Sequence, residues 1–148
     1  MNNDIRKLLE GVSDGSVSID DALLVLKKKP FEDLGYAKID LHREVRQGVA
    51  EVIYGASKTP EQILGIINAM KENGQGTILI TRLAEEAAVA IEKEHVLTYY
   101  KEARCGIIGE LPKPSGLGKI VVATGGTSDI PVAEEAATAG LASLSVRA

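Results

Sequence analysis

The chain has 148 residues, 45% apolar and 26% charged, and its 17 basic and 21 acidic side chains give a formal net charge of −4. This is an ordinary globular balance and argues against disorder. The mild acidity argues against a nucleic-acid binder, which needs a basic face, and the 3% aromatic content without tryptophan argues against base stacking.

Cys105 is the single cysteine, so it cannot form a disulfide within the chain, and no zinc-type cysteine cluster exists. A reducing, cytoplasmic setting is therefore expected. Cys105 lies in an apolar, strand-like stretch, which favours a buried, inert thiol over a nucleophile. No apolar run is long enough to span a bilayer, so no membrane partner is predicted.

Residues 1–30 predict a helical hairpin that serves packing or interaction. Apolar side chains fall on one face of a helix over residues 3–12, and Asp14–Ser16 is a turn. Ser18 then caps a second helix, which Pro30 ends.

Strands and helices alternate through residues 31–110, which predicts a small α/β domain. Its clearest helix has Thr59 as N-cap, Gln62 completing a capping box and Gly74 as C-terminal cap. The other predicted elements are strands at 49–54, 77–80, 96–100 and 104–108 and a helix at 84–94.

Residues 111–118 contain two prolines and two glycines and predict a linker. The continuous apolar run Ile120–Ala123 predicts a parallel strand buried on both faces, followed by a glycine loop and a helix from near Pro131. Residues 119–148 thus predict the first strand–helix unit of a doubly wound parallel sheet. Too few residues follow to pair this strand, so we expect a truncated domain completed by more chain or by another molecule.

The glycine loop is the strongest local signal for a ligand. Gly125 and Gly126 allow close backbone approach, and the following helix N-terminus directs N–H groups toward an anion. Thr127 and Ser128 offer hydroxyl donors, and Asp129 can accept from ribose hydroxyls. The alternative is a tight turn in which Ser128 or Asp129 only caps the helix.

Two further groups are candidate site residues. Glu134, in the first turns of that helix, can serve as an acid or base from a cleft, or only as a surface acid that compensates the helix dipole. His42, Arg43 and Arg46 can hold a phosphate or carboxylate, and a solvated, salt-bridged helix face is the alternative.

Two sequence blocks, in this order, resemble the LarB family of nickel-pincer-cofactor biosynthesis. The first block comprises Phe31–Asp40, His42–Arg43, Arg46–Gly48, Glu51–Gly55 and Lys58–Gln62. The second, Gly125–Ala136, is similar to the first strand–helix unit of that family's second domain, which is related to the PurE-type aminoimidazole ribonucleotide carboxylases. The resemblance covers roughly residues 5–140.

The resemblance implies an enzyme that carboxylates the pyridinium ring of nicotinic acid adenine dinucleotide with carbon dioxide or bicarbonate. It also implies cleavage of the phosphoanhydride, which releases AMP and leaves pyridinium-3,5-biscarboxylic acid mononucleotide. The family uses a cysteine of the later part of its second domain as a nucleophile that adds to the ring. Cys105 precedes that domain and does not match this cysteine, so this chain alone is expected to be inactive.

By the same match, Gly126–Asp129 contact the phosphate and ribose of a nucleotide substrate. No tightly bound cofactor is implied, Mg²⁺ is left open, and the complete protein is expected to be a homo-oligomer. Two alternatives stay open. A PurE-type aminoimidazole ribonucleotide carboxylase rests on Thr127–Pro131 alone, and a non-catalytic binding or regulatory module is suggested by the incomplete sheet.

Overall fold

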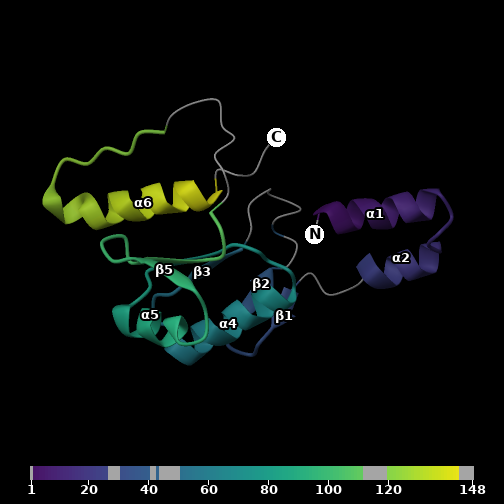
Figure 1. Ribbon diagram of the computed structural model, residues 1–148, viewed down its shortest axis with the longest axis horizontal. Coiled ribbons are helices and arrows are strands. Elements are labelled where there is room, and N and C mark those ends of the chain that lie inside the picture. The colour runs from purple at the N-terminus through teal and green to yellow at the C-terminus, as the bar shows by residue number, and fades with distance from the viewer. Residues whose placement is uncertain (1, 27–30, 41–42, 44–50, 112–119, 144–148) are drawn as a thin grey trace.

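The computed structural model describes residues 2–26, 31–40, 43, 51–111 and 120–143. Helices and a mixed sheet build it, so the predicted α/β class is confirmed (Figure 1). The helices are α1 (Asn2–Ser13), α2 (Ile19–Leu26), α4 (Pro60–Glu72), α5 (Glu85–Glu92) and α6 (Ile130–Ser143), with a 3-10 turn η1 (Thr127–Asp129). The strands are β1 (Phe31–Asp33), β2 (Lys38–Asp40), β3 (Val52–Tyr54), β4 (Ile78–Thr81), β5 (Leu97–Tyr100) and β6 (Cys105–Ile108).

Four of these strands form one sheet in the spatial order β3–β4–β6–β5. β3 and β4 are parallel, with Val52 opposite Leu79, and α4 connects them. The other pairs are antiparallel, with Ile78 opposite Ile108 and Tyr100 opposite Cys105. β1 and β2 form a separate antiparallel hairpin, hereafter the β1–β2 hairpin.

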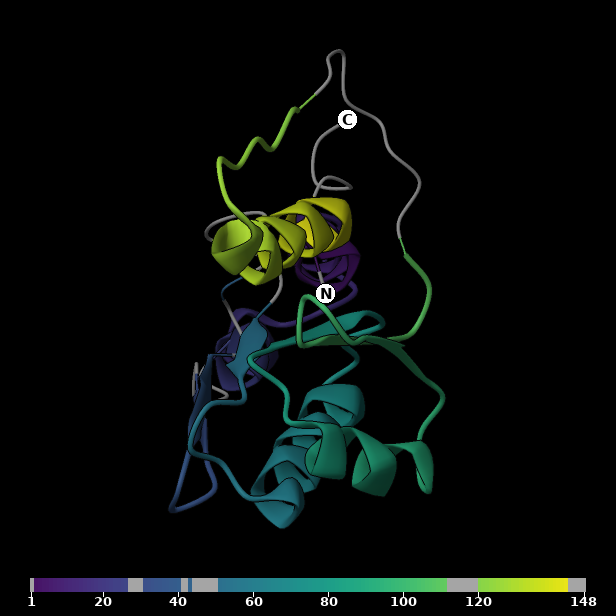
Figure 2. The same ribbon diagram turned by 90° about the vertical axis from the view of Figure 1, so that its left-hand side faces the viewer.

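Helices cover both faces of the four-stranded sheet (Figures 1 and 2). α4 and α5 lie against one face, where Ile78 and Ile80 of β4 point into the main core. α6 lies against the other face and packs its alanines near Leu79 and Cys105. Because both faces are covered, the central strands are largely buried: all four residues of β6 and the first three of β4 are buried.

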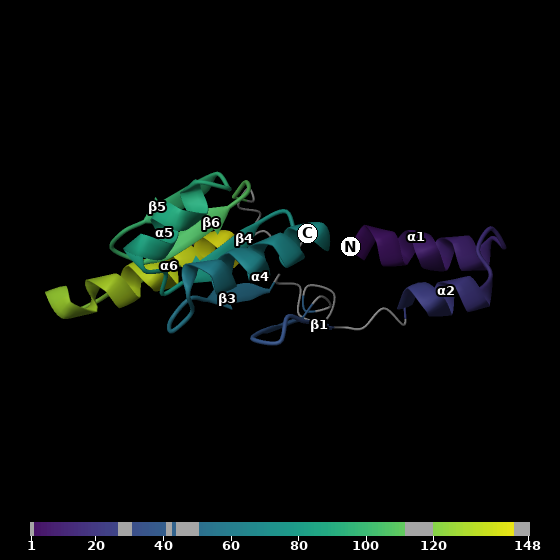
Figure 3. The ribbon, with the colours of Figure 1, turned by 90° about the horizontal axis from the view of Figure 1, so that it is seen from below.

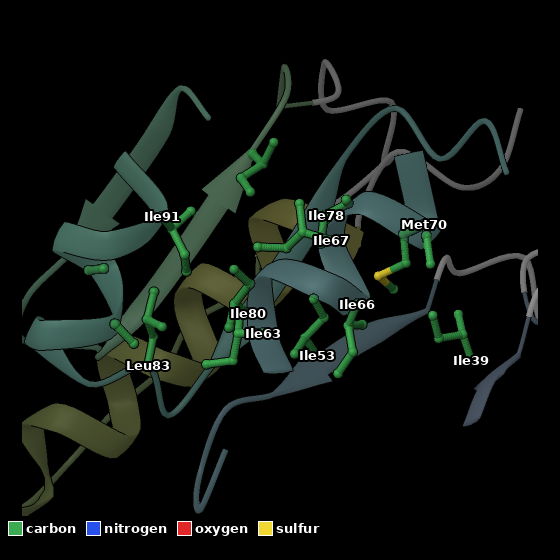
Figure 4. Packing of buried hydrophobic residues seen from close by; sticks show 14 residues of the cluster. Ile39, Ile53, Ile63, Ile66, Ile67, Met70, Ile78, Ile80, Leu83 and Ile91 are labelled. Atoms are coloured by element: carbon green, nitrogen blue, oxygen red, sulfur yellow. The ribbon is translucent and has the colours of Figure 1, made fainter. Parts of the chain in front are cut away.

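The main core is made of aliphatic side chains from the sheet, α4 and α5 (Figure 4). Its fully buried large side chains include Ile63, Ile67, Met70, Ile78, Ile80, Leu83 and Ile91. Ile39 of β2 joins this core opposite α4, so the β1–β2 hairpin docks on the edge of the domain through an apolar contact. Burial of such a side chain stabilises the fold by about 1.5–3 kcal/mol.

The predicted ends of α4 are confirmed. The Thr59 hydroxyl accepts from the Gln62 backbone N–H at 3.3 Å, and the side-chain Oε1 of Gln62 accepts from the Thr59 backbone N–H at 3.0 Å. At the other end Gly74 takes φ +84°, which only glycine adopts without cost, and the Gln75 N–H donates back to the Met70 carbonyl at 3.0 Å.

The predicted N-terminal hairpin is also observed, at one end of the molecule (Figure 3). The Ser18 hydroxyl accepts from the Asp21 N–H at 3.0 Å and donates to the Asp21 carboxylate at 2.6 Å, which caps α2. Ala22 is buried, but Leu9 and Val25 are about half exposed, so the two helices cover little of their own apolar surface. Pro30, the predicted end of the second helix, lies outside the described residues.

The predicted strand at Ile120–Ala123 is wrong. These residues form no strand, and Ile120 and Val121 are 71% and 84% exposed. A strand needs a neighbour for its backbone groups, and the structure places none of its described strands beside this segment. The helix that follows is present as α6, but it packs on β4 and β6 of the first sheet (Figure 2). Of the predicted linker only Leu111 is described.

Candidate functional site

The Gly125–Asp129 loop lies on the surface at the start of α6, and all of its residues are exposed. The Gly126 carbonyl accepts from the Asp129 N–H at 3.2 Å and from the Thr124 hydroxyl at 3.3 Å. No side chain caps η1, whose N-cap position is Gly126. A Cβ added at Gly125 would meet nothing within 4 Å, so the backbone here is open to an approaching group. The ligand role of the loop stays a prediction.

The two glutamates after the loop have different surroundings. Glu134 is exposed, whereas the side chain of Glu135 is only 17% exposed and faces the sheet. Its oxygens lie 2.8 and 3.1 Å from Nε of Arg82, just after β4. Glu135 therefore attaches α6 to the sheet. Glu134 is the one of the pair that is open to solvent, and its role in acid–base chemistry stays a prediction.

Cys105 lies beneath α6 on the same face of the sheet and is fully buried, as predicted. Its thiol donates to the Ala103 carbonyl at 3.4 Å. Burial, and to a lesser extent the negative charge of Glu135, raise the pKa of the thiol to about 11. A neutral, inaccessible thiol is a poor nucleophile at neutral pH, so Cys105 does not act as one in this fold.

Of the three basic candidates near the end of β2, the structure describes Arg43 alone; His42 and Arg46 lie outside the described residues. Nη1 of Arg43 is 3.5 Å from Oε1 of Glu51, which also accepts from the Val52 N–H at 3.2 Å. Nε of Arg43 is buried and has no hydrogen-bond partner among the described residues. Arg43 thus forms an ion pair with Glu51, and Glu51 lines a pocket of the domain.

That pocket, hereafter the hairpin pocket, lies between the β1–β2 hairpin, β3 and α4 and has a volume of about 240 Å³. Sequence reasoning did not identify it. Its wall has an apolar part, two tyrosines, two lysines and one glutamate. The lining residues are Tyr36, Ala37, Lys38, Ile39, Glu51, Val52, Ile53, Tyr54, Lys58, Ile66 and Met70.

The tight end of the β1–β2 hairpin positions Tyr36 in the pocket wall. Gly35 has φ +81°, and its N–H donates to the Asp33 carboxylate at 2.9 Å, so the chain turns sharply before Tyr36. The tyrosine then reaches α4, because its hydroxyl oxygen occupies the place that a side chain at Gly65 would take. Tyr36 therefore bridges the hairpin and the helix.

A second turn positions Lys58 in the pocket wall, directly before the N-cap of α4. The Gly55 N–H donates to the Thr81 carbonyl at 2.7 Å, and the Lys58 N–H donates to the Gly55 carbonyl at 3.2 Å. Between them Ser57 has φ 62°, a left-handed conformation. Lys58 is half-buried, and no ion pair or hydrogen bond joins its side chain to the described part of the chain.

The loop and the hairpin pocket do not form one site. The start of α6 and the β1–β2 hairpin lie far apart in two perpendicular views (Figures 1 and 3). Within the described ranges no group of three or more His, Cys, Asp or Glu side chains could hold a metal ion. No helix there is both long and apolar enough to cross a membrane.

Two comparisons with known proteins bear on this geometry. A family model described as the LarB/PurE-like N-terminal domain matches residues 31–110, the segment that contains the sheet and the hairpin pocket. The chain is also 32% identical, over 143 residues, to the uncharacterized protein MJ0165 of Methanocaldococcus jannaschii. The match covers 92% of this chain but 56% of that relative, so the chain spans a little over half of the relative's length.

Proposed function

Because this chain belongs to the family of the LarB/PurE-like N-terminal domain, we propose that it is the N-terminal part of a carboxylase/hydrolase acting on nicotinic acid adenine dinucleotide. The observation that carries the proposal is the family match over residues 31–110. The second sequence block, at Gly125–Ala136, supports it independently, because it follows in the order that the LarB family has.

The proposed reaction has two parts. A ring carbon of the pyridinium forms a bond to the carbon of carbon dioxide and loses its proton. Water cleaves the phosphoanhydride, so that AMP leaves and pyridinium-3,5-biscarboxylic acid mononucleotide remains. The ring becomes nucleophilic enough for the first part only after a thiolate adds to it and is later expelled.

In the proposed reaction, this chain binds and orients the nucleotide substrate. Gly125 and Gly126 give the phosphates access to the backbone, and Thr127 and Ser128 donate hydrogen bonds to them. Asp129 accepts from a ribose hydroxyl. The exposed, uncapped loop supports these roles. The attacking thiol comes from outside this sequence, because Cys105 is buried and protonated.

In the test, the part of the M. jannaschii relative that lies outside the match is fused to this chain directly after Ser143. The fusion protein is then supplied with nicotinic acid adenine dinucleotide. We expect AMP release that needs bicarbonate and that Asp129→Ala reduces in the fusion. Glu110→Ala, an exposed acid outside the loop, is the matched control. A fusion that folds yet releases no AMP in bicarbonate would refute the proposal.

A non-catalytic nucleotide-binding module is the second candidate. It is favoured by the environments of two reactive side chains. Cys105 is buried, and Glu135 forms an ion pair with Arg82, so neither is free to take part in chemistry. Such a module binds the dinucleotide but leaves it intact in the fusion, so the same assay with a binding measurement beside it separates the two candidates.

A further inference from the structure

We propose that the hairpin pocket is a second binding site, for a nucleoside monophosphate, with Lys58 holding the phosphate and the apolar wall holding the base. This site is separate from the Gly125–Asp129 loop, and the inference does not depend on the proposed reaction. Its evidence is the shape, charge and chemistry of the pocket wall.

The charge of the pocket wall favours the binding of an anion. The whole chain carries −4, whereas the charged residues of the pocket wall are two lysines and one glutamate, which sum to +1 (2 − 1). The Glu51 charge is offset by Arg43 at 3.5 Å. Lys38 has only a long contact of 3.8 Å to Asp33, and both side chains are largely exposed, so this pair is weak. Lys58 has no ion-pair partner in the described ranges and is the cation available to a ligand.

Another part of the pocket wall is suited to a flat, weakly polar ring. Ile39, Ile66 and Met70 line the pocket but are only 2%, 5% and 1% exposed, so they offer a ligand little surface. The accessible surface of this wall comes from aromatic side chains, among them Tyr54, which is 60% exposed. Tyr36, fixed against Gly65, adds a half-exposed ring on the same wall. Ligand sites combine such an apolar surface with few polar groups.

Volume limits the ligand to a small molecule. The pocket encloses about 240 Å³, somewhat below the range of about 300–1,000 Å³ typical of sites for drug-sized ligands. A base with its ribose occupies that space while the phosphate lies at the rim with Lys58. Glu51 accepts from a ribose hydroxyl with the lone pairs that Arg43 and the Val52 N–H leave free.

The test titrates the whole chain with AMP, adenosine and inorganic phosphate, each alone, by calorimetry at low salt. We expect AMP to bind, and adenosine and phosphate each to bind at least about tenfold more weakly, since each lacks one half of the contacts. Equal affinity for adenosine and AMP overturns the role of Lys58. Equal affinity for phosphate and AMP overturns the role of the apolar wall.

Variants locate the site. Lys58→Ala is expected to weaken AMP binding by about tenfold or more, whereas Lys93→Ala, an exposed lysine after α5, leaves it unchanged. Amide chemical shifts are then expected to move at Ala37 and Lys58 and not at Gly125 and Gly126. Shifts confined to the glycine loop, or no loss in Lys58→Ala, contradict the proposal. A negative result here leaves bicarbonate-dependent AMP release by the fusion unaffected, so the two proposals fail separately.

Discussion

Arg82 and Glu135 join α6 to the end of β4 through Nε of Arg82, which lies 2.8 Å from one glutamate oxygen and 3.1 Å from the other. The two residues are 53 positions apart in the sequence. Arg82 also has φ 52°, a left-handed conformation that costs a non-glycine residue about 1–2 kcal/mol. The backbone strain is therefore located at the residue that holds α6 in place.

Comparison of Arg82→Gly with Arg82→Ala separates the two effects. Both remove the ion pair, which contributes about 1 kcal/mol or less because Arg82 is partly exposed. Only glycine relieves the strain, so we expect Arg82→Gly to be more stable than Arg82→Ala by about 1 kcal/mol. Urea unfolding measures the difference, and hydrogen exchange is expected to speed up in α6 in both variants. Equal stability of the two variants would contradict a left-handed Arg82.

The buried thiol of Cys105 predicts a loss of stability at high pH. Folding raises its pKa from the ordinary 9.0 to about 11, so the folded state resists ionisation of the thiol. The stability of the fold is complete below about pH 9 and falls as the pH rises toward 11, by on the order of 2 kcal/mol. The control Cys105→Ala has no thiol at this position, so its unfolding free energy lacks this dependence on pH. Unfolding free energies of both proteins from pH 8 to 11 test this, and parallel curves would rule it out.

The contribution of the capping box to the free energy of unfolding can be measured at Thr59. Thr59→Ala removes the acceptor for the Gln62 N–H and is expected to destabilise the fold by about 1 kcal/mol. Thr59→Ser keeps a hydroxyl in the same place and is expected to lose much less. Thermal unfolding of the pair measures this. If both variants lose the same amount, the hydroxyl is not what caps α4.

Local signals in the sequence identified the elements whose causes are local. The capping box at Thr59 and Gln62 and the terminal Gly74 fixed both ends of α4 because they act within one turn of the helix. The strands that became β5 and β6 were also found, since their apolar residues lie close together in the chain.

Long-range contacts set the rest, and the sequence pattern did not reveal them. β1 and β2 have three residues each, too few for a visible period of two, so the β1–β2 hairpin and its pocket were missed. Tyr36, Glu51, Tyr54 and Lys58 all lie in the first block of the LarB resemblance, which was the available signal. Ile120–Ala123 is apolar enough for a strand, but strand formation also needs a partner.

Gly65→Ala tests the wall of the hairpin pocket without changing any charge. Alanine favours the helix by up to about 1 kcal/mol, but its methyl group needs the space of the Tyr36 hydroxyl. We expect AMP affinity to fall by about tenfold or more while stability changes by less than about 1 kcal/mol. Asn68→Ala, on the exposed side of α4, is the control for binding. Unchanged AMP affinity in Gly65→Ala would show that Tyr36 does not form the wall.

We propose that this chain is the N-terminal part of a pyridinium carboxylase. The most direct measurement supplies the fusion described above with nicotinic acid adenine dinucleotide and ¹³C-bicarbonate and analyses the nucleotides by mass spectrometry. We expect a mononucleotide that carries the ¹³C label in a new carboxylate, formed together with AMP. Unlabelled nucleotides, from a fusion shown to be folded and to bind the dinucleotide, would contradict it and leave the non-catalytic module as the better description.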